Sequence, residues 1–150
     1  MLDSCCSNRA FWFNKKDPRA IYVDKRKETI VLTDRVMEIS PDIQADFTNL
    51  PFPDNTFTIV VFDPPHVIRE EARGYITKRY GVLNGDWRTM LKDGFSECFR
   101  VLKPNGTLIF KWSDSNVPVA EILALTPEKP LFGHKSGKLS LTHWIAFLKS

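Results

Sequence analysis

Short apolar runs alternate with longer polar stretches along the chain, and this pattern predicts strands and helices in turn. The runs are rich in β-branched and aromatic residues, which favour buried strands. Predicted strands cover residues 20–23, 29–32, 43–46, 57–62, 107–112 and 142–148. The strongest run, 57–62, stops at Asp63-Pro64-Pro65, because proline cannot donate a hydrogen bond to a neighbouring strand.

One long helix is predicted between the fourth and fifth of these strands. Apolar residues from Trp87 to Leu102 recur at spacings of three and four, which places them on one helical face, and Asp86 is a suitable N-cap. The sequence 103–106 predicts a turn after this helix, and residues 117–125 suit a shorter helix. Strands that alternate with helices predict an α/β fold, with a mostly parallel, twisted sheet and helices on both faces.

The length of the chain favours a single domain over residues 1–150. No apolar run reaches the roughly 18 residues that a membrane-spanning helix needs, and the first residues lack the pattern of a signal peptide. We therefore expect a cytoplasmic protein. Cys5, Cys6 and Cys98 do not have the paired spacing of zinc ligands, so the sequence predicts small buried thiols and no metal site.

Basic residues gather in two stretches, although the net charge of +3 favours an anionic partner only weakly. A solvated rim and a nucleic-acid patch explain these clusters equally well. The irregular segment 64–86 follows a strand end and is a candidate substrate loop. The clustered cations are Lys15, Lys16, Arg19, Lys25, Arg26 and Lys27 in the first stretch, and Arg69, Arg73, Lys78 and Arg79 in the second.

Acidic residues end three of the predicted strands, at Asp24, Asp46 and Asp63, and Asp3 would end a further short strand at the start of the chain. Any one of them suits a turn or a helix cap. The carboxyl ends of parallel strands meet at one edge of a sheet, so four in succession favour a shared ligand there. Asp24 follows Asp3 by 21 residues, which resembles the interval between a nucleotide-binding loop and the acid that holds ribose hydroxyls. The sequence has no phosphate-binding loop, so a nucleoside ligand fits better than a triphosphate.

Two longer segments and one tetrapeptide resemble class I S-adenosylmethionine-dependent methyltransferases. Residues 46–57 are similar to the segment between that family's adenine-binding acid and its fourth strand. Residues 99–108 are similar to its helix end, turn and fifth strand. Asp63-Pro64-Pro65-His66 resembles the [DN]-P-P-[YFWH] motif of amino-directed methyltransferases. The resemblance implies a minimal Rossmann-like methyltransferase fold and S-adenosylmethionine as cofactor.

The resemblance also implies a set of cofactor-binding residues. Asp3 is expected near the methionyl end of the cofactor, Asp24 at the ribose hydroxyls, Asp46 and the Phe47 backbone at adenine, and Phe62 with Asp63 where the methyl group meets the substrate.

The family's first loop reads Asp-x-Gly-x-Gly-x-Gly, whereas this chain has no glycine at 3–9. Cys5 and Ser7 are small residues at the second and third fixed positions of this motif, and both are expected to contact the cofactor. The sequence starts at the family's first strand, which would end at Asp3, without the family's usual N-terminal helices. We therefore expect an open cofactor site, or one that a partner or a second subunit covers.

The motif 63–66 suits methyl transfer to an amino or amide nitrogen. The Asp63 carboxylate and the Pro64 carbonyl can accept hydrogen bonds from the amino group and turn its lone pair toward the methyl donor. Pro64 and Pro65 fix the backbone, and His66 can stack on a planar substrate. A nucleobase, a nucleic acid and a protein amide all remain candidate substrates. The alternative is a non-catalytic binding module that has the fold and a degenerate cofactor loop.

Overall fold

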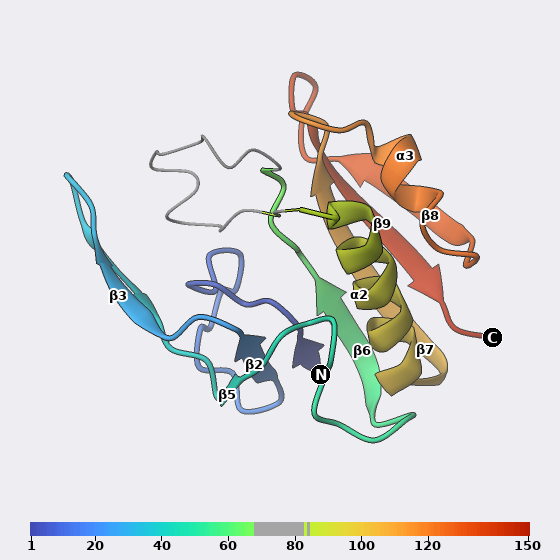
Figure 1. Ribbon diagram of the computed structural model, residues 1–150, viewed down its shortest axis with the longest axis horizontal. Coiled ribbons are helices and arrows are strands. Elements are labelled where there is room, and N and C mark those ends of the chain that lie inside the picture. The colour runs from blue at the N-terminus through green and yellow to red at the C-terminus, as the bar shows by residue number, and fades with distance from the viewer. Residues whose placement is uncertain (68–82, 84) are drawn as a thin grey trace.

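Seven strands form one sheet in the computed structural model, which describes residues 1–67, 83 and 85–150. The strand order is β5-β2-β1-β6-β7-β9-β8, and β9 runs in the direction opposite to the other six strands (Figure 1). The strands are β1 (Leu2–Asp3), β2 (Ile21–Asp24), β5 (Ile43–Gln44), β6 (Phe57–Phe62), β7 (Leu102–Ser113), β8 (Pro130–Lys135) and β9 (Thr142–Leu148). The predicted mostly parallel α/β sheet is confirmed.

A separate antiparallel hairpin consists of β3 (Glu28–Val31) and β4 (Val36–Ile39). Only the first of these strands was predicted. Strand β8 was not predicted either, because all six of its residues are exposed and no buried face imposes alternation on its sequence. The turn expected at 103–106 lies within β7, where Asn105 has a φ of 61° and its N–H donates to the Lys149 carbonyl.

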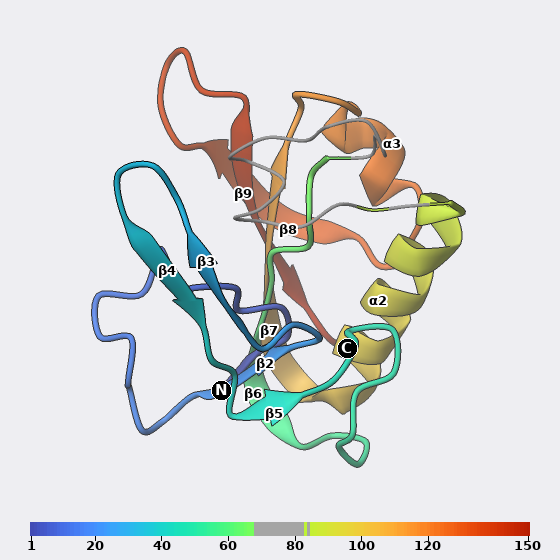
Figure 2. The same ribbon diagram turned by 60° about the vertical axis from the view of Figure 1, so that its left-hand side comes forward.

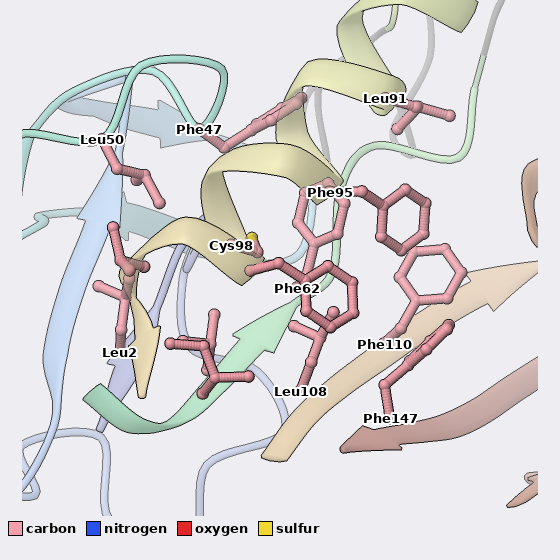
Figure 3. Close-up of a cluster of buried hydrophobic side chains, with 14 of the residues drawn as sticks. Leu2, Phe47, Leu50, Phe62, Leu91, Phe95, Cys98, Leu108, Phe110 and Phe147 are labelled. Carbon is pink, nitrogen blue, oxygen red and sulfur yellow. The ribbon is translucent and has the colours of Figure 1, made fainter. Parts of the chain in front are cut away.

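Both described helices, α2 (Trp87–Val101) and α3 (Val119–Leu123), pack on the same face of the sheet. The Asp86 side chain accepts a hydrogen bond from the Thr89 N–H, which confirms the predicted N-cap. The buried face of α2 joins an aromatic core that Figure 3 shows between this helix and strands β6, β7 and β9. Among the described residues, no helix is long and apolar enough to cross a membrane.

The segment between β1 and β2 and the β3–β4 hairpin lie on the other side of the sheet from α2 and α3 (Figure 2). Within the described residues, this face is contacted by aromatic side chains rather than by a helix. Phe11 packs edge-on against Trp144 of β9, and Trp12 packs edge-on against Tyr22 of β2. These contacts fix the segment that follows β1 over the sheet.

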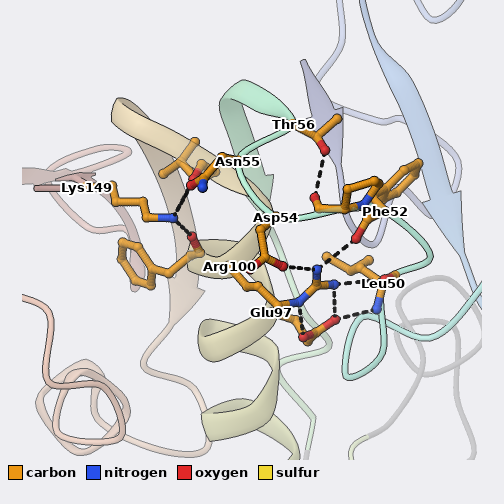
Figure 4. Close-up of polar contacts among 11 residues, drawn as sticks. Leu50, Phe52, Asp54, Asn55, Thr56, Glu97, Arg100 and Lys149 are labelled. Atoms are coloured by element: carbon orange, nitrogen blue, oxygen red, sulfur yellow. Dashed lines mark hydrogen bonds and ion pairs between the residues drawn. The ribbon is translucent and has the colours of Figure 1, made fainter.

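Arg100, near the end of α2, ties the segment before β6 to this helix (Figure 4). Its guanidinium donates to both carboxylate oxygens of Glu97 at 2.7 and 2.8 Å, and to Asp54 at 2.9 Å. It also donates to the backbone carbonyls of Phe52 and Leu50, at 2.8 and 3.0 Å. Because the hydrogen bond with Arg100 stabilises the carboxylate, the pKa of Glu97 is lowered.

We expect Arg100→Met to lower the free energy of unfolding by about 1–3 kcal/mol, because two carboxylates and two carbonyls lose their charged donor. Urea denaturation checks this. The matched control is Arg88→Met, which removes an exposed ion pair with Glu121 and should cost less than about 0.5 kcal/mol. Equal losses in the two variants would show that the Arg100 network does not stabilise the fold.

Candidate active site

A cavity of about 440 Å³ lies at the carboxyl ends of the central parallel strands. This volume falls within the roughly 300–1,000 Å³ of small-molecule sites. Asp24 is the last residue of β2, Phe47 lies in the segment after β5, and Asp63 directly follows β6; all three line the cavity. The cavity is therefore lined by residues that end successive parallel strands, at the edge where open α/β sheets bind ligands.

The loop after β1 forms one wall of the cavity. The Ser4 N–H donates to the Val61 carbonyl at 3.0 Å, and the Cys6 N–H donates to the Val23 carbonyl at 2.7 Å. The loop is thus hydrogen-bonded between β6 and β2. Its direction depends on two residues in the left-handed region, Ser7 (φ 45°) and Arg9 (φ 56°).

Ser7 and Arg9 occupy the positions of the second and third glycines in Asp-x-Gly-x-Gly-x-Gly. Their positive φ values are those that glycine adopts without steric cost. The loop thus has the backbone that the glycine motif favours, although its sequence has none of these glycines. A non-glycine residue in this region costs on the order of 1–3 kcal/mol, which the surrounding hydrogen bonds must offset.

The Asp24 carboxylate holds this loop against the end of β2. Its Oδ2 accepts from the Ser7 N–H at 2.8 Å, and its Oδ1 accepts from the Arg26 N–H at 2.9 Å. The Arg26 guanidinium lies 3.4 Å from Oδ1. A carboxylate has about four acceptor positions, so Asp24 can still accept hydrogen bonds from a ligand.

Asp3 is completely buried behind the loop and does not line the cavity. Its carboxylate accepts from the Trp12 indole N–H at 2.8 Å and, at 3.4 Å, from the Cys5 N–H. Burial raises the pKa of Asp3 to about 7, and the nearby Asp63 carboxylate adds to this rise, while the Trp12 hydrogen bond opposes it. Asp3 therefore titrates near neutral pH.

Asp63 also lines the cavity and lies between two basic side chains. The Lys111 ammonium donates to its Oδ2 at 2.8 Å, and His66 Nε2 lies 3.0 Å from its Oδ1. His66 also packs edge-on against Trp112.

Cys5 and Cys98 lie near Asp3, and burial raises the pKa of both thiols, that of Cys98 to about 12. Both cysteines are therefore thiols at neutral pH, which disfavours nucleophilic catalysis by either of them.

The predicted site residues divide into two groups by their position. Those that line the cavity are Cys5, Ser7, Asp24, Phe47, Asp63 and Pro65. Those that do not are Asp3, Asp46, Phe62, Pro64 and His66. Phe62 is fully buried and packs against Phe47, while the Asp46 carboxylate accepts hydrogen bonds from the Thr48 N–H and hydroxyl. Each residue of the second group therefore either supports a residue that lines the cavity or lies next to one.

Several lining residues were not predicted from the sequence. Lys111 lies on β7, Met90 lies on α2, and Phe11 comes from the loop after β1. Lys111 lies beside Asp63 because β6 and β7 pair in a particular register, and this register cannot be inferred from the sequence of either strand. Most of the candidate substrate loop 64–86 and the second basic cluster at 69–79 lie outside the described residues.

The raised pKa of Asp3 predicts a pH-dependent stability. In the folded protein the Asp3 carboxyl keeps its proton up to about pH 7, whereas an aspartate in the unfolded chain loses its proton near pH 4. The contribution of Asp3 to stability is therefore full below about pH 4 and falls as the pH rises to about 7. Asp3→Asn retains the acceptor for Trp12 and removes the titration.

We expect Asp3→Asn to gain stability relative to the parent protein by on the order of 2–4 kcal/mol between about pH 4 and pH 8. Denaturant unfolding across this range measures the difference. Asp34→Asn, an exposed carboxylate in the hairpin connection, should show no such trend. Parallel stability curves for Asp3→Asn and the parent would mean that Asp3 does not titrate near neutral pH.

No protein-family model matches the chain, and no curated protein matches it in sequence. Solved structures do match over almost its whole length. The PH0226 protein of Pyrococcus horikoshii shares 18% identity with a TM-score of 0.66, covering 99% of this chain and 81% of that protein. A SAM-dependent methyltransferase of Methanosarcina mazei shares 12% identity with a TM-score of 0.59, covering 99% and 91%.

A third similar structure contains ligands. It is the 1,6-didemethyltoxoflavin-N1-methyltransferase of Burkholderia thailandensis with bound 1,6-didemethyltoxoflavin and S-adenosylhomocysteine. It shares 13% identity with a TM-score of 0.57, covering 99% of this chain and 70% of that protein. Identities this low show the fold alone: the chain has the Rossmann-like fold of S-adenosylmethionine-dependent methyltransferases.

Proposed function

We propose that this chain transfers a methyl group from S-adenosylmethionine to an amino or amide nitrogen, with a nucleobase or nucleic acid as the favoured acceptor. One observation carries the proposal: a single cavity of suitable volume is lined by Asp24, Phe47 and Asp63 at successive strand ends. The fold is consistent with this function but does not by itself determine it, because one fold supports many activities.

The residues around the cavity suit the chemical groups of S-adenosylmethionine. Asp24 offers acceptor positions to ribose hydroxyls, and Phe47 offers a flat apolar surface to adenine. The buried Asp3 and the loop with Cys5 and Ser7 would lie near the methionyl part, whose ammonium and the adjoining sulfonium are cations. The anionic form of Asp3 favours a ligand with these positive charges.

When bound, S-adenosylmethionine supplies an activated methyl group on its sulfonium. The task of the protein is to hold the acceptor nitrogen beside that methyl group. The Asp63 carboxylate and the Pro64 carbonyl would accept the amino protons and so direct the nitrogen lone pair. Since the carboxylate is fixed by Lys111 and His66, little reorganisation accompanies this contact. Asp63 can also accept the proton that the methylated nitrogen releases.

A partner protein forms part of this proposal. The structure of a putative methyltransferase of Haloferax volcanii that is similar to this chain, with a TM-score of 0.57 and 14% identity, was solved with the Trm112 methyltransferase activator. By analogy, a partner or second subunit would cover the cofactor site of this chain. The proposed location remains the cytoplasm.

A non-catalytic binding module is the second candidate function. It is favoured by the loop after β1, which has none of the family's glycines, and by the hydrogen bonds from the Ser7 N–H and Arg26, which leave fewer acceptor positions on Asp24 for ribose. Ser7→Gly should release the loop from its strained φ without removing the backbone N–H.

Titration calorimetry with S-adenosylmethionine tests the two candidates. We expect micromolar to millimolar binding that Asp24→Asn weakens by about 10-fold or more, through the loss of a charged acceptor. Because Asp3 ionises near pH 7 and its anion favours a cationic ligand, the affinity should rise from about pH 6 to about pH 8. Asp34→Asn is the control.

Binding of S-adenosylmethionine by the parent protein and by Ser7→Gly distinguishes the two candidate functions. No binding by the parent protein at millimolar ligand, followed by binding in Ser7→Gly, supports the non-catalytic module. No binding by either protein removes the methyltransferase proposal.

A further inference from the structure

Strand β8 forms one edge of the seven-stranded sheet and is exposed along its whole length (Figure 1). The strand at the other edge, β5, has two residues, whereas β8 has six. Leu131 and Phe132 of β8 are 59% and 72% exposed. A long edge strand with exposed apolar side chains is a template for pairing with a further strand. The β8 edge is therefore a candidate interaction surface.

The register of β8 with β9 determines which backbone groups of β8 point away from the sheet. The Ser136 N–H donates to the Thr142 carbonyl at 2.9 Å, and these two residues continue the β8–β9 register. Hydrogen-bonded pairs recur at every second residue of an antiparallel ladder, so Gly133 and Lys135 direct their N–H and carbonyl groups outward. No described strand pairs with this side of β8. The outward groups are therefore available to an added strand.

A groove of about 690 Å³ runs beside this edge, between β8 and α3. Val119 and Leu123 of α3 and Ile145 of β9 give it an apolar lining. It shares no described residue with the lining of the cavity in the candidate active site.

The apolar surface extends over both faces of the β8 edge. A Cβ at Gly133 would lie 3.0 Å from Ile145 Cγ1, so Gly133 faces the same side of the sheet as Ile145 and the groove. Successive residues of a strand point to opposite faces, which places Phe132 on the other side. An added strand covers both faces with alternate side chains, whereas a helix in the groove would leave Phe132 exposed.

The charge of the groove selects the kind of strand that fits it. Lys135 and Lys138 line the groove, and no described lining residue is an acid. Asp114 lies near Lys135, but its carboxylate is hydrogen-bonded to His143 Nε2 and to the Val119 N–H. A second copy of the chain would bring a second groove with the same positive charge. An acidic strand supplies the carboxylates that the two lysines lack.

We propose that the β8 edge binds an extended, acidic segment of a partner protein as a further strand of the sheet. Backbone hydrogen bonds with Gly133 and Lys135 provide affinity, as in other cases of strand addition. Alternate apolar side chains of the segment cover Leu131 and Phe132, and its carboxylates pair with the lysines of the groove. This interaction does not depend on the proposed methyl transfer.

Synthetic peptides of the length of β8 test this proposal with the parent protein. In the first peptide valine alternates with glutamate, and in the second lysine replaces every glutamate. Fluorescence anisotropy of the labelled peptides measures their binding. We expect the valine–glutamate peptide to bind with a dissociation constant below about 1 mM, and the valine–lysine peptide to bind at least about 10-fold more weakly. Equal binding of the two peptides would contradict the proposed charge selection.

Hydrogen exchange of the backbone amides distinguishes strand addition from binding in the groove alone. Because their N–H groups point outward, the amides of Gly133 and Lys135 should exchange about 10-fold more slowly with the valine–glutamate peptide bound. The His134 amide faces β9 already and is the internal control, with a change of less than about 2-fold. Unchanged exchange at Gly133 and Lys135 in the complex would show that the peptide does not add as a strand.

Variants of exposed residues identify the side-chain contacts. Phe132→Ser should weaken peptide binding by about 10-fold, and Lys138→Met by about 3-fold, with little change in Tm because both side chains are exposed. Lys27→Met removes an exposed cation outside the groove and is the matched control. Binding of the peptide by Phe132→Ser with the affinity of the parent protein would overturn the proposed apolar contact.

Sedimentation velocity of the parent protein distinguishes a partner segment from a second copy. The proposal predicts no association through β8 in the absence of peptide. A dimer that Phe132→Ser dissociates would show that a second copy occupies the edge, which overturns the proposal. Absence of peptide binding at millimolar concentration would overturn it as well. Either result leaves the methyltransferase proposal unchanged, since the groove and the cavity are separate.

Discussion

The packing of Phe62 fixes where the central strand leaves the core and where the candidate site begins. Phe62 is fully buried, and its ring centroid lies 5.3 Å from those of Phe47 and Phe95 and 5.7 Å from that of Phe110. Asp63 is the next residue and lines the cavity. The same aromatic contacts therefore hold both the end of β6 and Phe47, the apolar surface of the site (Figure 3).

Gly94 on α2 makes this arrangement sterically feasible. A Cβ at this position would lie 2.7 Å from ring atoms of both Phe47 and Phe62, closer than side-chain atoms approach. Without a side chain there, the helix packs directly on the two rings. The position of α2 is thereby coupled to the shape of the cavity, and any larger residue at Gly94 would displace Phe47.

The acids of the site are also supported before any ligand binds. Trp12 donates a hydrogen bond to Asp3, and the backbone N–H groups of Ser7 and Arg26 donate to Asp24. Asp63 is hydrogen-bonded to Lys111 and His66. Fixed hydrogen-bond groups lower the cost of reorganisation during a reaction, which is how many active sites stabilise charge. Asp3 differs from the other two acids in having no exposure, and its burial raises its pKa to about 7.

Local sequence patterns predicted much of the fold. Strand 57–62, strand 142–148 and the helix capped by Asp86 have strong periodicity and clear ends, and the structure confirms them. Strand β8 is exposed throughout, and β4 alternates between exposed and buried residues over only four positions, so neither was predicted from its sequence. They form because pairing with neighbouring strands supplies what the local sequence does not.

The site was predictable only in part, for a similar reason. Acids at strand ends are visible in the sequence, and Asp24 and Asp63 do line one cavity. The contact between Asp63 and Lys111 joins residues 48 positions apart, and the contact between Ser113 and His66 joins residues 47 apart. Such contacts depend on the β6–β7 register. The left-handed backbone of Ser7 could not be predicted either, because serine rarely adopts it.

A crystal structure of the protein with S-adenosylhomocysteine tests the central claim most directly. The account predicts adenosine between Asp24 and Phe47, with the ribose hydroxyls within hydrogen-bond distance of the Asp24 carboxylate and the sulfur directed toward Asp63. A ligand bound outside this cavity, or with its adenosine away from Asp24, would contradict the account.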